Sequence, residues 1–167
     1  MRKIKTLRII VDIIWIISIV GLILVAVIGV YAFLSGGLSD NFKFNGIETS
    51  KLSKLNLFLI IFLNAFNLLI YYCIYLFREI VHAFDNLKVF SKTVIDNFNK
   101  IGFILILVGI INTVNSLLTT LVYEKFSSSF SLNWNTLGLV ALGLFCSVLS
   151  EIFKISKNLK KENDLTI

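Results

Sequence analysis

The chain has 167 residues, of which 57% are hydrophobic, with a mean hydropathy of +0.88 and a net charge of +6. Soluble domains average about 45–50% apolar residues, so the composition excludes an ordinary soluble domain. The apolar residues fall in four blocks, each near the roughly 20 residues that cross a hydrocarbon core of about 30 Å. We therefore predict an all-α, polytopic integral membrane protein, with one domain of four transmembrane helices over residues 1–167.

The first apolar block follows a basic amino terminus and runs from Ile9 to Leu34. It is longer than the about 7–15 apolar residues of a secretory signal, and no A-x-A cleavage pattern follows it. We therefore expect a retained transmembrane helix over residues 9–34. Asp12 lies at i+4 from Arg8, where the two side chains could pair or reach the headgroup layer.

Residues 35–54 are expected to form an external loop, because Gly36-Gly37 interrupts the apolar block. Asn45-Gly46 is a favourable two-residue hairpin turn, so a short ribbon could form here over the outer end of the helices. An irregular loop is the alternative, and we favour it.

The rest of the chain alternates apolar and polar segments. Ser91 is expected to cap the amino end of the third of the four helices. On this prediction that helix begins in the cytoplasm, about ten residues before it enters the membrane. In order, the segments are a helix over 55–77, a cytoplasmic bridge over 78–100, helices over 101–123 and 136–153 with an external loop over 124–135 between them, and a cytoplasmic tail over 154–167.

The distribution of Lys and Arg predicts the orientation. The amino terminus, the bridge and the tail carry four each, against three in the first external loop and one in the second. Twelve against four places both termini and the bridge in the cytoplasm by the positive-inside rule. Basic residues beside membrane spans are also explained by anionic lipid, so we expect a lipid bilayer and no direct binding of nucleic acid.

Small and polar residues inside the spans indicate where the helices pack, since lipid provides no hydrophobic drive for pairing. Gly102 and Gly109 lie on one face of the third helix and Gly143 and Ser147 on one face of the fourth, which predicts a close seam. Four asparagines are expected to form an interhelical polar layer near the bilayer centre. They are Asn64 and Asn67 on the second helix and Asn112 and Asn115 on the third, at matching depths.

The residues that carry most enzymatic chemistry are sparse. His82 is the single histidine, and its neighbours Glu79 and Asp85 suggest a solvated face more than a metal site. Cys73 and Cys146 lie in apolar blocks without partners at motif spacing. We expect no catalytic site, no metal and no cofactor, and thus not an enzyme.

Apolar residues recur in the bridge at roughly helical spacing, which a simple loop would not require, and the tail adds two leucines. Such a stretch can offer a surface to another helix or lie in the membrane interface, and it could equally extend the membrane helices. The candidate cytoplasmic interaction surface is Ile80, Phe84, Leu87, Phe90, Ser91, Leu159 and Leu165.

The bridge and the carboxyl terminus resemble a family of small bacterial four-helix membrane proteins, domain of unknown function 2975. The resemblance lies in Asn86-Leu87-Lys88-Val89-Phe90-Ser91, followed by Lys100-Ile101-Gly102, and in Glu151-Ile152-Phe153-Lys154 with the ending that starts at Leu159. Val89 stands where that family has Pro. The resemblance implies the bacterial cytoplasmic membrane and a multi-pass topology, and its members are often encoded beside a small helix-turn-helix transcription factor.

Two functions remain open from the sequence. The first is a regulatory or interaction protein whose cytoplasmic bridge and tail bind a soluble partner, such as a cytoplasmic DNA-binding regulator. The second is a small transporter, channel or accessory membrane subunit with the asparagine layer as its path, for which a homo-oligomer could form the pore.

Overall fold

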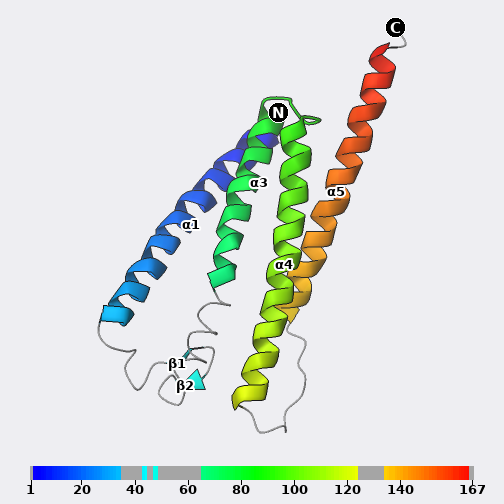
Figure 1. Cartoon of the computed structure of the whole chain (residues 1–167). Helices are drawn as coiled ribbons and strands as arrows, with labels where there is room; N and C mark the ends of the chain where they lie inside the picture. Colours follow the sequence, from blue (N-terminus) through cyan, green and yellow to red (C-terminus); the bar gives the residue numbers. More distant parts are fainter. Residues whose placement is uncertain (1, 35–42, 45–46, 49–64, 124–133, 166–167) are drawn as a thin grey trace.

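The structure is a computed structural model, and it describes residues 2–34, 43–44, 47–48, 65–123 and 134–165. Its elements are α1 (Arg2–Leu34), β1 (Lys43–Phe44), β2 (Ile47–Glu48), the 3-10 turn η2 (Phe66–Leu68), α3 (Leu69–Asp85), α4 (Lys92–Tyr123) and α5 (Trp134–Leu165). The described part of the chain is therefore helical apart from one pair of two-residue strands. In Figure 1 the long helices lie side by side in chain order, with α3 packed between α1 and α4, and α5 packed on α4.

Three of the described helices are long and apolar enough to cross a membrane. They are Lys3–Leu24 in α1, Lys92–Leu117 in α4 and Trp134–Asn163 in α5. The first half of the predicted second span, residues 55–64, lies outside the described residues. The structure thus supports a membrane protein through three spans, and four remains the prediction from the sequence.

α1 shows how little of this apolar surface is covered by protein. Among the α1 side chains that the structure describes, Val11 alone is buried, whereas Ile13 and Ile17 are half or more exposed. Contiguous apolar surface on this scale is not found on soluble monomers. The outer face of α1 is therefore suited to lipid.

The predicted bridge is mostly helix, which differs from the expected boundaries. α3 continues past Phe77 to Asp85, whereas α4 begins at Lys92, ahead of the predicted span at residue 101, as the predicted cap at Ser91 requires. Residues 86–91 form the turn between them. As predicted, Ser91 caps α4, because its Oγ accepts a hydrogen bond from the backbone N–H of Val94 at 3.3 Å.

The turn after α3 has an unusual residue at its centre. Lys88 N–H donates to the Ala83 carbonyl and Leu87 N–H to the Phe84 carbonyl, the pattern of a Schellman cap. This cap places Leu87 in the left-handed region at φ 60°. Glycine usually occupies that position, because a Cβ there is crowded.

α3, α4 and α5 share one core. Its buried residues are Cys73, Leu76 and Ile80 from α3 and Val94, Phe98, Ile101 and Leu105 from α4. Phe153 of α5 closes the core at the end that carries the α3–α4 turn, where its ring stacks on Phe98 with centroids 5.5 Å apart and also meets Phe84 and Phe90.

The predicted seam of small residues lies between α4 and α5. A Cβ on Gly102 would lie 2.8 Å from the carbonyl oxygen of Gly143, and one on Gly143 would lie 2.8 Å from that of Gly102. The two backbones therefore touch, which only glycine permits at this crossing. Farther along, Ser150 Oγ donates to the Ile95 carbonyl at 2.9 Å and ties the same helices together.

α5 does not end at the expected border of residue 153. It continues as one helix to Leu165, so most of the predicted tail is helical. In Figure 1 this part of α5 projects beyond the α3–α4 turn, at the end where α1 begins. We call residues 154–165 the α5 extension.

The first external loop contains the ribbon that we ranked behind an irregular loop. β1 and β2 pair antiparallel, with Lys43 opposite Glu48 and Phe44 opposite Ile47. This register is the one that a two-residue connection produces. Asn45 and Gly46 themselves, and the rest of residues 35–54, lie outside the described residues.

Candidate functional site

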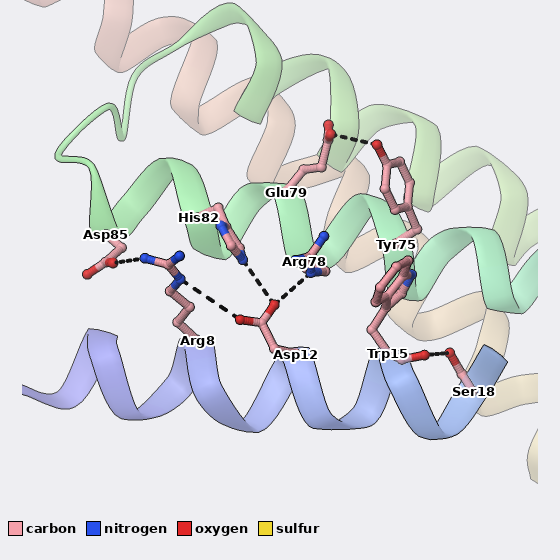
Figure 2. Close-up of polar contacts among 9 residues, drawn as sticks. All are labelled: Arg8, Asp12, Trp15, Ser18, Tyr75, Arg78, Glu79, His82 and Asp85. Carbon is pink, nitrogen blue, oxygen red and sulfur yellow. Dashed lines mark hydrogen bonds and ion pairs between the residues drawn. The ribbon is translucent and has the colours of Figure 1, made fainter. Parts of the chain in front are cut away.

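A cluster of charged side chains joins α1 to α3 at the end of the molecule that carries the α3–α4 turn (Figure 2). We call Arg8, Asp12, Arg78, His82 and Asp85 the charge cluster. Arg8 and Asp12 are one turn apart on α1, and Arg78, His82 and Asp85 occupy the facing side of α3. The cluster therefore holds together two helices that share few buried apolar residues.

Asp12 is the centre of the cluster. Its Oδ1 accepts hydrogen bonds from Arg78 Nε at 2.6 Å and from His82 Nε2 at 3.0 Å. Its other oxygen lies 3.9 Å from Arg8 Nε. A carboxylate only accepts hydrogen bonds, so all three contacts favour the ionised form of Asp12. The predicted Arg8–Asp12 pair exists, but it is the longest of the three.

Arg8 and Arg78 each make a second contact. Arg8 Nη1 donates to Asp85 Oδ2 at 2.8 Å, which links the start of α1 to the end of α3. The Arg78 guanidinium lies over the Trp15 ring, 4.6 Å from its centroid. Stacking on an aromatic face suits a guanidinium, and it explains why Trp15 lies deeper in the first span than an aromatic belt requires.

Glu79 points to other partners. It accepts a hydrogen bond from the Tyr75 hydroxyl at 2.8 Å and one from Asn97 Nδ2 at 3.3 Å. Asn97 is only 4% exposed, so these contacts tie α3 to α4 inside the protein. Together with the charge cluster they give α3 a polar contact on each side.

The titratable side chains at this end of α3 do not converge on one point in the described residues. Glu79, His82 and Asp85 share a stretch of α3, yet each turns to a different partner. No group of three or more His, Cys, Asp or Glu side chains in the described part of the chain could hold a metal ion. The cluster can orient helices and balance charge, which are structural tasks.

The structure brings two of the four predicted asparagines together. Asn112 Nδ2 of α4 donates to Asn67 Oδ1 of η2 at 2.9 Å. Asn115 is 5% exposed, and among the described residues nothing donates to its Oδ1. Asn64 lies outside the described residues. The layer therefore holds one direct contact and one buried oxygen without a donor.

The predicted interaction surface needs correction at two residues. Ile80 is 1% exposed and belongs to the core, because it follows Leu76 by one turn on the face that packs against α4. Phe84 is partly buried against Phe153. Ser91 uses its hydroxyl as a helix cap, and the side chain of Leu165 lies outside the described residues.

Three of the remaining predicted residues are exposed. Leu87 is 68% exposed, Phe90 38% and Leu159 60%. A hollow of about 670 Å³ opens between the α3–α4 turn and the α5 extension, lined by Phe90, Ser156, Leu159, Lys160, Glu162 and Asn163. We call the hollow together with Leu87 the turn–α5 surface. Two stretches that are about 70 residues apart in sequence meet there.

The long-range half of the charge cluster was not among the predicted contacts. Arg78 and Asp12 are 66 residues apart, and no local pattern links them. A usable signal was present, however. α1 carries two of these charged or titratable groups and α3 carries three, each about one turn from the next at the predicted cytoplasmic border, and such groups near a membrane are expected to pair.

Comparison with known families gives one match. The family model described as "Protein of unknown function (DUF2975)" matches residues 43–167. These residues include the α3–α4 turn and the whole of α5. No curated protein and no solved structure matches the chain significantly.

Proposed function

Because the chain belongs to the DUF2975 family of unknown function, whose description assigns no activity, we propose a function from the geometry of its own residues. The protein is a membrane-anchored interaction protein of the bacterial cytoplasmic membrane. It has four spans, keeps both termini in the cytoplasm and holds a soluble protein on its turn–α5 surface. A small helix-turn-helix regulator is the kind of partner that the family resemblance implies, which would make the role regulatory.

The observation that carries this proposal is the conformation of Leu87. A non-glycine residue in the left-handed region costs about 1–2 kcal/mol, and this residue also exposes an apolar side chain. Folding alone would favour glycine at this helix end. A costly, exposed leucine is therefore better explained by something that binds it, and strain of this kind often occurs at functional sites.

The position of the surface supports the same reading. The α3–α4 turn, the start of α1 and the α5 extension are at one end of the molecule (Figure 1). The Lys and Arg count of twelve against four assigns these segments to the cytoplasm. A soluble partner could therefore reach Leu87, Phe90 and Leu159 without entering the bilayer.

The test is Leu87→Gly in the full-length, tagged protein. We expect its thermal midpoint in detergent to rise, because the strain is relieved, while the amount of one soluble protein retained after crosslinking in native membranes falls several-fold. Leu142→Ala is the matched control, since Leu142 is similarly exposed on the membrane-spanning part of α5. Retention that is unchanged in Leu87→Gly would contradict the proposal.

A second function is favoured by the asparagine layer. Among the described residues nothing donates to the buried Asn115 Oδ1, and an unsatisfied polar atom is costly in a membrane. A polar solute or water passing along α4 could satisfy it, as in a small transporter or channel. Flux of a solute into liposomes that contain the purified protein, abolished by Asn115→Leu, would support this alternative, and absence of flux would leave the first.

A further inference from the structure

We infer that the occupant of the turn–α5 surface is an acidic amphipathic helix of a soluble protein. The inference rests on the proposed function and names the chemistry of its partner. Three observations carry it: the shape of the α5 extension, the charge around the hollow and the distance of the hollow from the apolar part of α5.

The lining residues of α5 indicate a helical ligand. Ser156, Leu159 and Asn163 follow each other at spacings of three and four, so they lie along one face of the helix together with Lys160. They span about 10 Å, or two turns. A second helix packs along such a face at an interaxial distance of about 8–10 Å, and its end would rest on Phe90.

The apolar part of the lining indicates an amphipathic ligand. Phe90 and Leu159 are both exposed, and the Phe90 ring stays in place because it also packs against Phe153. Two apolar anchors one or two turns apart on the partner helix would cover them. The hollow is shallow and widely open, so these anchors would lie across it and not inside an enclosed pocket.

The charge around the hollow indicates that the ligand is acidic. The α3–α4 turn and the α5 extension hold five lysines, Lys88, Lys154, Lys157, Lys160 and Lys161, against two acids, Glu162 and Asp164. Lys160 and Glu162 line the hollow itself, so the excess of positive charge lies around it. A partner with carboxylates beside its apolar anchors would therefore be attracted and oriented.

Two other occupants fit less well. A second copy of this chain would bring the same excess of lysine, and a twofold contact would place like charges together. Lipid tails fit less well, because Leu159 lies about 9 Å beyond the predicted membrane border at Phe153 and is followed by Lys160 and Lys161, whose charges are costly in hydrocarbon. An anionic headgroup would pair with lysine but would leave Phe90 and Leu159 uncovered.

The test uses a photoreactive amino acid at Leu159 of the full-length protein in its native membranes. The same residue at Lys161, which does not line the hollow, is the control position. We expect a crosslink at Leu159, absent at Lys161, to a soluble protein. The crosslinked peptide should be an amphipathic segment with net negative charge.

A charge reversal provides the second arm. Lys160→Glu should reduce the Leu159 crosslink several-fold, whereas Lys161→Glu, with the same change in charge on the next residue, should reduce it little. Gel-filtration profiles that match the parent protein would show that both variants fold. Both side chains are exposed in the extension, so we expect both variants to fold like the parent protein.

The outcomes separate the two proposals. The inference would be overturned, and the proposed function would stand, in either of two cases. In the first, the crosslinked segment of the soluble partner is neutral or basic. In the second, Lys160→Glu leaves the yield of the Leu159 crosslink unchanged. Crosslinks to lipid or to a second copy of the chain, or none at Leu159, would overturn both.

Discussion

Asp12 of α1 accepts a hydrogen bond from Arg78 of α3 at 2.6 Å, and this contact stands at the centre of the α1–α3 interface. Around it, His82 and Arg8 complete a set of donors for one carboxylate. Val11 is the one α1 side chain among those described that is buried. The attachment of α1 therefore depends on charge more than on apolar packing.

Removing the Asp12 carboxylate should weaken the attachment of α1 to α3. We expect Asp12→Asn to lower the thermal midpoint in detergent by several degrees, because Arg78 and His82 keep their donors but lose the carboxylate charge that balances them. Arg78→Gln should have a similar effect. The thermal midpoint of the double variant should fall by clearly less than the sum of the two single decreases, since residues in one network do not act independently.

The control for this prediction is Glu151→Gln. Glu151 and Lys154 also form an ion pair, at 3.3 Å, but both side chains are about 60% exposed. Exposed pairs contribute little to stability, so the midpoint should stay nearly unchanged. Equal effects of Asp12→Asn and Glu151→Gln would show that the charge cluster has no special role.

The α4–α5 seam should not accept a methyl group. In Gly102→Ala the added Cβ would press on Ser147 Oγ and lie 2.8 Å from the Gly143 carbonyl oxygen, so the helices must separate. Overpacking of this kind costs about 1–3 kcal/mol. Unfolding of the purified variant in detergent against a denaturant measures this loss.

Gly138→Ala is the matched control for the seam. It lies on the same helix as Gly143, and a Cβ there would meet nothing within 4 Å. Alanine is the better helix former by about 1 kcal/mol, so this variant should be as stable as the parent or more so. If Gly102→Ala and Gly138→Ala changed the free energy of unfolding by the same amount, the close contact between α4 and α5 at Gly102 would be contradicted.

The asparagine pair should contribute a small, measurable coupling. Interhelical hydrogen bonds in membrane proteins average about 0.6 kcal/mol, so Asn67→Leu and Asn112→Leu should each destabilise slightly, and the double variant no more than either. Asn115→Leu should cost less than Asn112→Leu, because it removes an oxygen that has no donor among the described residues. A larger loss in Asn115→Leu would mean that this oxygen is satisfied in the membrane.

Local patterns predicted the features that local physics determines. Ser91 precedes an apolar helix and caps it. Asn45-Gly46 also indicated the pairing of β1 with β2, although an irregular loop was the favoured prediction. The depths of Asn67 and Asn112 could be counted from the ends of the apolar blocks, because antiparallel helices rise equally per residue. The two side chains meet in the structure.

The features that could not be predicted depend on contacts between distant segments or on a rare conformation. Nothing near Leu87 marks it as the left-handed residue of a helix cap, since glycine is the usual signal. Arg78 meets Trp15 and Asp12 only because α3 packs against α1. Ile80 was placed on a surface because its apolar neighbours fit either a core or a docking face, and only the position of α4 decides between them.

The orientation of the chain can be checked with single cysteines. In a Cys73→Ala/Cys146→Ala background, Lys51→Cys should react with a membrane-impermeant maleimide in intact cells, because residues 35–54 are predicted to lie outside. Lys160→Cys should react only after the membrane is permeabilised, because the α5 extension follows the basic, inward-facing side. The reverse pattern would place the turn–α5 surface outside the cell, where no cytoplasmic partner could reach Leu87 or Leu159.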